Sequence, residues 1–251
     1  MSIRTEWLFD GALLKVVLNR PKANIIDTDM LRAISEFLGT VAPETKALIF
    51  EGAGDHFSFG ASVQEHRRES AAEMLRRFHA VFRQLLALSV PTIAVVRGQC
   101  LGGGLELASF ASWVFASDTA VFGQPEIRLG VFPPVASVLL PWRLGGGAAL
   151  DLCVSGRTWS ATEAHTRGLV HAVVANPAAA AETFVHDELL PKSASSLRFA
   201  ERAARHSLDA EFDGRLRALE AIYLGELMTT RDANEGIAAF IEKRAPRFQN
   251  L

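Results

Sequence analysis

Hydrophobic positions along the chain recur at two different spacings, and segments of the two kinds alternate. Residues 8–18 predict a β-hairpin, because two apolar runs flank the pair Asp10-Gly11. Apolar residues at helical spacing predict a helix that begins near Asp27 or Thr28, and another over residues 71–88 that Pro91 stops. Further short apolar runs predict buried strands at residues 47–50, 92–96, 113–116, 120–122 and 169–174. This alternation predicts an α/β fold with crossover connections.

Two later segments of the chain depart from this alternation of strands and helices. Prolines and glycines predict an ordered, non-helical surface loop over residues 123–134. Beyond about residue 190 the pattern turns almost wholly helical, with helices expected at residues 195–205, 210–228 and 234–243. We therefore expect a mixed core at residues 1–190 and a helical region at residues 191–251.

Composition and charge exclude several classes of function. The chain has 251 residues and a formal net charge of −2, so nothing favours binding to nucleic acid or to an anionic membrane. The N-terminus lacks an apolar signal stretch, and no run is long and apolar enough to span a bilayer. Cys100 and Cys153 form no disulfide framework, and the histidines form no metal-ligand pair. We expect a cytoplasmic protein with reduced thiols and no metal site.

Three consecutive glycines, Gly102 to Gly104, follow the strand expected at residues 92–96 and precede good helix-forming residues. They are expected at a helix N-terminus, where free backbone N–H groups suit a developing oxyanion. Glu106 then lies about one turn into that helix, and a strand-turn-strand segment returns Glu126 to the same place. Two carboxylates beside such a pocket suit general acid-base chemistry. Taken singly, the glycines are more typical of a tight structural turn, and each glutamate of a solvated surface charge.

Together these motifs resemble the crotonase superfamily of enoyl-CoA hydratases and isomerases, over nearly the whole chain. The segments that carry the resemblance are residues 19–23, 57–61, 98–106, 122–126 and 235–244. The resemblance implies a spiral of ββα units with a C-terminal helical region that builds trimers, often paired as hexamers. It also implies an acyl-CoA substrate and no separate cofactor, because coenzyme A enters as part of the thioester.

The resemblance assigns roles to individual residues. The backbone N–H groups of Ala61 and Gly103 are expected to hold the thioester oxygen, and Glu106 and Glu126 fall on the two catalytic glutamates of hydratases. The residues expected to line the coenzyme A and substrate path are Lys22, Ala23, Phe59, Gly60, Ser62, Gly102, Pro133, Val135, Phe240 and Lys243. The expected reaction is addition of water to a conjugated enoyl-CoA.

Three departures from the common family pattern concern the acyl group. Most members carry a Pro-Gly-Ala-Gly-Gly-like loop where this chain has Pro133 to Ser137, and aspartate is common where this chain has Ser62. Residues 24–27 also replace the usual Leu-Asn-Ala pattern. These features resemble the branch that hydrates cyclohexa-1,5-diene-1-carbonyl-CoA in anaerobic aromatic degradation. The stiff residues Pro133, Pro134 and Val135 are expected to form a wall that suits a flat ring.

Other functions remain open at this point. An ordinary short-chain enoyl-CoA hydratase has the same motifs, whereas an isomerase usually lacks one of the two glutamates. A crotonase-fold protein that binds acyl-CoA or RNA without catalysis usually loses a glutamate or an oxyanion position, and this chain has all four. A serine peptidase is disfavoured, because no Ser/His arrangement lies near the glycines.

Overall fold

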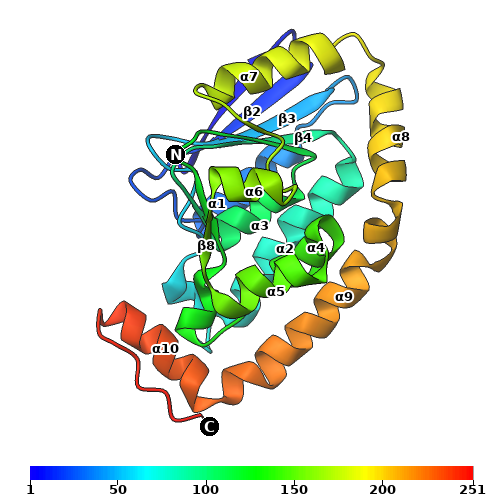
Figure 1. Ribbon diagram of the computed structural model, residues 1–251. Helices are drawn as coiled ribbons and strands as arrows, with labels where there is room; N and C mark the ends of the chain where they lie inside the picture. The colour runs from blue at the N-terminus through cyan, green and yellow to red at the C-terminus, as the bar shows by residue number, and fades with distance from the viewer. Residues whose placement is uncertain (251) are drawn as a thin grey trace.

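The computed structural model describes residues 1–250, which form strands, α-helices and short helical turns (Figure 1). The strands are β1 (Ile3–Leu8), β2 (Leu13–Leu18), β3 (Ala47–Gly52), β4 (Thr92–Val96), β5 (Gln99–Leu101), β6 (Trp113–Ala116), β7 (Val121–Gly123), β8 (Thr158–Ser160) and β9 (Ala172–Val173). The α-helices are α1 (Thr28–Leu38), α2 (Ala71–Leu88), α3 (Gly103–Phe110), α4 (Pro134–Leu144), α5 (Gly146–Ser155), α6 (Ala161–Thr166), α7 (Pro177–Phe184), α8 (Ala194–Ala204), α9 (His206–Gly225) and α10 (Arg231–Ile241). The short turns are η1 (Val63–His66), η2 (Pro125–Leu129), η3 (Val185–Leu189) and η4 (Leu227–Thr229).

The larger sheet has the strand order β1-β2-β3-β4-β6-β9 and is parallel except for the hairpin of β1 and β2. Strands β2 and β4 are buried along their whole length, as expected for parallel strands covered on both faces. On one face, Ala181 and Val185 from α7 and η3 join the apolar residues Ile49 and Val95 in one cluster. The other face joins the main core, which includes residues of α1, α2, α3 and α4.

The chain spirals between this sheet and a second layer. After β4 and β6 it enters β5 and β7, which pair in a smaller sheet with the order β5-β7-β8. Earlier turns make single bridges, Ile26 with Ala61 and Ser58 with Cys100, that continue the same layer. Each of the first three passages of the chain from the larger sheet to the second layer is followed by a helix, α1, α2 and α3 in turn. This repeat confirms the expected spiral of ββα units.

The C-terminal helices α8, α9 and α10 run around the outside of this core, from the side of the sheet to the opposite end of the molecule (Figure 1). Leu208, Phe212 and Leu216 of α9 are buried in the main core with residues of α2 and α4. Arg205 anchors the start of α9, because its Nη2 donates to the Phe110 carbonyl over 2.7 Å. A C-terminal helical region is therefore confirmed, while a boundary at residue 190 and a role in trimer formation stay predictions.

Two predicted strands have different bounds in the structure. The hairpin uses β1 and β2, not residues 8–18, because Phe9 and Asp10 take the left-handed φ values 52° and 53° and lie in the turn. The last strand is limited to Ala172–Val173, because the N–H groups of Leu169 and Val170 both bond to the Ala164 carbonyl of α6. The hydrophobic pattern of the sequence predicts neither the left-handed turn nor the hydrogen bonds to α6.

The predicted loop at residues 123–134 is partly helical. Pro125 begins the 3₁₀ turn η2, and Gly130 ends it with a left-handed φ of 73°. Pro134 begins α4, where its missing N–H costs nothing because the first N–H of a helix has no internal acceptor. Proline therefore starts a helix at both places.

Candidate active site

The glycine segment forms the helix N-terminus that its sequence predicts. Gly102 takes φ 51° and ψ −127°, a backbone conformation that side chains disfavour, and its N–H bonds to the Gly123 carbonyl over 2.9 Å. Helix α3 begins at Gly103, so Glu106 lies in its first turn. The first N–H groups of α3 are thereby left without acceptors inside the helix.

The backbone nitrogens of Ala61 and Gly103 face the same small space. A Cβ built on Gly60 would lie 3.2 Å from the Gly103 nitrogen, and one built on Gly103 would lie 3.1 Å from the Ala61 nitrogen. Within residues 1–250, neither N–H donates a backbone hydrogen bond. A side chain at Gly103 would also meet the Phe78 ring at 3.1 Å. Two neighbouring backbone N–H groups without backbone acceptors suit the binding of an oxyanion.

Glu106 is a buried carboxylate held by the start of another helix. Only 4% of its surface is exposed, and its Oε1 accepts a 2.7 Å hydrogen bond from the Ala136 N–H in the first turn of α4. The Val135 N–H is a second donor. Burial raises the pKa of Glu106 to about 7, and the two N–H donors act in the opposite direction.

Glu126 lies on η2, with its carboxylate directly over the start of α3. Its Oε1 would be 2.5 Å from a Cβ built on Gly102, and together with the φ of 51° this favours glycine at the position. The amide nitrogen of the buried Gln124, with the amide oriented to donate, lies 3.0 Å from Oε2 and 3.2 Å from Oε1. Burial, and after it the charge of Glu106, raises the pKa of Glu126 well above its usual range. The two carboxylates therefore form an interacting pair.

Side chains from α5 and α9 complete the surroundings of the pair. Burial and then the charges of Glu106 and Glu126 raise the pKa of Cys153 to about 12, and the same causes raise the pKa of Tyr223. The Tyr223 ring meets the Phe132 ring edge-on, with 5.4 Å between the centroids.

The sequence comparison agrees with this geometry. The family model described as enoyl-CoA hydratase/isomerase matches residues 9–250. The chain belongs to this family.

Two bacterial hydratases are among the named relatives of this family member. A cyclohexa-1,5-dienecarbonyl-CoA hydratase of Thauera aromatica is 47% identical over 96% of this chain and 94% of its own length. A crotonyl-CoA hydratase of Syntrophomonas wolfei is 35% identical over 94% of each chain. Among solved structures, an enoyl-CoA hydratase from Mycobacterium avium subsp. paratuberculosis matches with a TM-score of 0.86, at 27% identity over 99% of each chain.

The residues expected to contact coenzyme A lie in two places. The Ala23 carbonyl accepts a 2.9 Å hydrogen bond from the Phe59 N–H, which joins two of the predicted segments, and Lys22 is exposed beside them. Phe240 and Lys243 are exposed at the end of α10 and just beyond it. In residues 1–250, no side-chain hydrogen bond or ring contact joins these two groups, and their roles stay predictions.

The remaining predicted residues are positioned by backbone contacts. The Gly60 carbonyl accepts from the Ile26 N–H over 2.9 Å, and the Ser62 N–H bonds to the Ile26 carbonyl over 3.1 Å. Pro133 and Val135 are buried near the Glu106 carboxylate. Their contact with an acyl group stays a prediction.

Sequence reasoning missed four groups at the site: Gln124, the N–H groups at the start of α4, Cys153 and Tyr223. One local signal indicated the helix start whose N–H groups bind Glu106: a proline followed by helix-forming residues. Cys153 and Tyr223 had none, because only tertiary packing brings α5 and α9 to the carboxylates.

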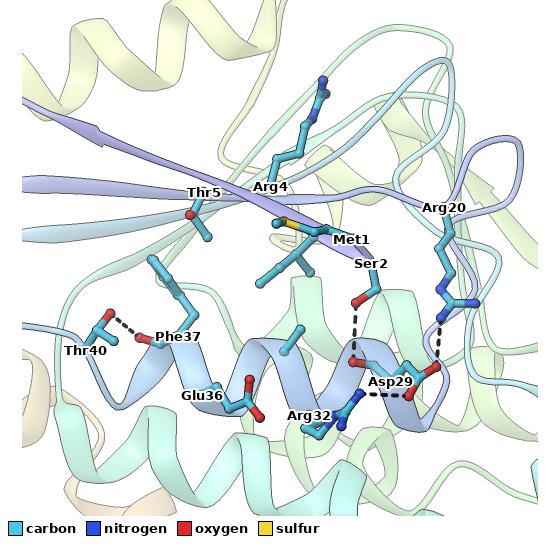
Figure 2. A pocket seen from close by; sticks show the side chains of 12 residues that line it. Met1, Ser2, Arg4, Thr5, Arg20, Asp29, Arg32, Glu36, Phe37 and Thr40 are labelled. Carbon is cyan, nitrogen blue, oxygen red and sulfur yellow. Dashed lines mark hydrogen bonds and ion pairs between the residues drawn. The ribbon is translucent and has the colours of Figure 1, made fainter.

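A wide hollow of about 1010 Å³ lies elsewhere, between β1 and α1 (Figure 2). Asp29 in it pairs with Arg32 at 3.2 Å and with Arg20 at 3.5 Å, and these side chains are exposed. None of the predicted site residues lines it. The described residues contain no cluster of three or more side chains suited to a metal ion, and no described helix has the length and hydropathy needed to cross a membrane.

Proposed function

We propose that this enzyme adds water to a conjugated enoyl-CoA thioester, and that its substrate is cyclohexa-1,5-diene-1-carbonyl-CoA. The observation that carries the proposal is the pair of the buried Glu106 and the half-buried Glu126, beside the free N–H groups of Ala61 and Gly103. A thioester oxygen bound by those two donors brings its conjugated double bond to the carboxylates.

Near neutral pH, the carboxyl groups of Glu106 and Glu126 are suited to share a single proton. Burial raises both pKa values, and the mutual repulsion disfavours the doubly charged state. Glu106 accepts the N–H groups of Val135 and Ala136, which favour its ionised form, so it serves as the base. Glu126 lies against the charge of Glu106 and therefore retains the proton, which makes it the acid.

The proposed reaction balances with these groups alone. Glu106 removes a proton from water while the water oxygen bonds to the electron-poor carbon of the conjugated system. The displaced electron pair moves to the thioester oxygen, where Ala61 and Gly103 stabilise the enolate; one such donor is typically worth about 3–4 kcal/mol. The enolate then collapses as Glu126 delivers its proton to carbon. The proton on Glu106 passes to Glu126, which restores the starting protonation of the pair.

The cyclic substrate is supported by two observations. The cyclic-diene hydratase of Thauera aromatica is 47% identical to this chain, whereas the crotonyl-CoA hydratase of Syntrophomonas wolfei is 35% identical. In addition, Pro133 and Pro134 fix the backbone where α4 begins, so the segment between η2 and α4 is rigid. A rigid, apolar wall favours a flat ring over a flexible chain.

The test compares kcat/KM for cyclohexa-1,5-diene-1-carbonyl-CoA with kcat/KM for crotonyl-CoA. We expect the cyclic thioester to be the better substrate by at least about tenfold, a difference of about 1.4 kcal/mol in transition-state stabilisation. A tenfold preference for crotonyl-CoA would instead identify an ordinary short-chain hydratase. Movement of the double bond without uptake of water would identify an isomerase.

We further propose how the enzyme works in the cell. Coenzyme A is held by Lys22 and Ala23 together with Phe240 and Lys243, without a separate cofactor. The enzyme assembles as a trimer or hexamer and acts in the cytoplasm, where reducing conditions keep Cys100 and Cys153 as free thiols.

A further inference from the structure

Tyr223 carries a buried hydroxyl that no protein group satisfies. Its side chain is 1% exposed, and within residues 1–250 its Oη has no hydrogen-bond partner. It is also the single tyrosine of the chain. Burial of an unpaired hydroxyl is unfavourable, and phenylalanine would fill the same space without that cost. We therefore expect the Tyr223 hydroxyl to form a hydrogen bond with a group that is not part of the folded chain.

The position of Tyr223 is well determined by its neighbours. Glu220, one turn earlier on α9, forms a hydrogen bond with the buried His79 of α2. The residue beside His79, Phe78, lies against Gly103 in the oxyanion pocket. On its other side the Tyr223 ring packs against Phe132, which lies between Glu126 and α4. Helix α9 is thereby fixed against α2, and the Tyr223 ring lies against the segment that follows Glu126.

The charges of both carboxylates act on the hydroxyl. The charges of Glu126 and Glu106 raise the pKa of Tyr223, in addition to the effect of burial. The phenol therefore stays protonated at neutral pH and acts as a hydrogen-bond donor.

The geometry of water leaves one place for such a donor. A water that donates one hydrogen to the Glu106 carboxylate and the other to the carbonyl oxygen of the protonated Glu126 uses one lone pair to attack carbon and has one lone pair left. The neighbouring backbone of α4 does not supply a donor for it, because Pro134 has no N–H and the N–H groups of Val135 and Ala136 are bonded to Glu106.

We propose that the Tyr223 hydroxyl donates a hydrogen bond to the oxygen of the attacking water, and to the same oxygen once it has become the hydroxyl of the product. Tyr223 is then a third catalytic side chain, contributed by the C-terminal helix α9. This role rests on the proposed hydratase activity.

Tyr223→Phe tests the role, because it removes the hydroxyl and keeps the ring. We expect kcat for hydration to fall about tenfold, which corresponds to about 1.4 kcal/mol, and KM to stay within about twofold. The melting temperature should stay unchanged or rise, since no protein contact is lost. Ser109→Ala is the matched control: Ser109 Oγ on α3 is likewise buried without a partner within residues 1–250, and its removal should leave kcat unchanged.

The outcomes separate this role from the proposed function. Wild-type protein that hydrates neither crotonyl-CoA nor the cyclic dienoyl-CoA overturns the proposed function and the role together. An active wild type with an equally active Tyr223→Phe variant overturns the role of Tyr223 alone. A loss of activity accompanied by a lower melting temperature assigns Tyr223 to structural support and also overturns the proposal.

Discussion

The Ala136 N–H donates a 2.7 Å hydrogen bond to Glu106 Oε1, and this contact joins the start of α4 to the first turn of α3. Two helix N-termini thus meet at one carboxylate, and the positive ends of their dipoles favour its ionised form. This effect opposes the burial of Glu106, which raises the pKa of the carboxyl, and the proposed base therefore ionises near neutral pH.

Replacement of either glutamate by glutamine tests the acid-base pair. Glu106→Gln and Glu126→Gln should each lower kcat by about 10²–10⁴, because each removes a group that transfers a proton in the reaction. The fold should be retained, since glutamine has a similar shape. Steady-state kinetics with circular dichroism as the control decide the matter. Near-normal activity of either variant would remove that residue from the mechanism.

Gly102→Ala should inactivate the enzyme by displacing Glu126. The new Cβ would lie 2.5 Å from Glu126 Oε1, and the φ of 51° adds backbone strain. We expect kcat to fall by about 10² or more. The control is Gly214→Ala in α9, where a Cβ meets nothing within 4 Å and alanine favours the helix by about 1 kcal/mol. If Gly102→Ala kept full activity, Glu126 would not need its present position.

The pH dependence of stability follows from the raised pKa of Glu106. The folded-state pKa of about 7 lies above the ordinary glutamate pKa of 4.5. Between these values the folded protein holds a proton that the unfolded chain has lost, so Glu106 makes the protein less stable as pH rises from about 4.5 to about 7. Glutamine does not titrate, so Glu106→Gln should gain stability relative to wild type over this range. Urea unfolding of both proteins at pH 5 and pH 7.5 measures the difference; an equal difference at both pH values would contradict the raised pKa.

The assembly prediction concerns the exposed apolar residues of the C-terminal helices. Phe199 of α8 is 61% exposed and Ile222 of α9 is 42% exposed in the single chain. We expect such residues to be covered in a trimer or a multiple of three. Light scattering at micromolar concentration gives the mass, and a monomer would contradict the prediction. Phe199→Glu should weaken the assembly if α8 contributes to the contact.

Much of the architecture could be read from local patterns. The alternation of strands and helices predicted the α/β class, the three glycines predicted the N-terminus of α3, and the position of Glu106 in its first turn followed from that. Family resemblance supplied the pairing of Glu106 with Glu126. Boundaries were less predictable where long-range contacts compete with local preference, as at Leu169 and Val170, whose N–H groups bond back to α6 instead of extending β9.

By itself, the sequence determined the order of most helices and strands, though not all of their bounds, and which residues carry acid, amide or hydroxyl groups, because those properties depend on side-chain chemistry and neighbours along the chain. Only the tertiary structure decided that Ala136 caps Glu106, that Glu126 lies over Gly102, and that Tyr223 packs against Phe132. Each of these contacts joins segments far apart in the sequence. They form because burial of the shared apolar core brings α3, α4 and α9 together, and no local pattern encodes which faces then meet.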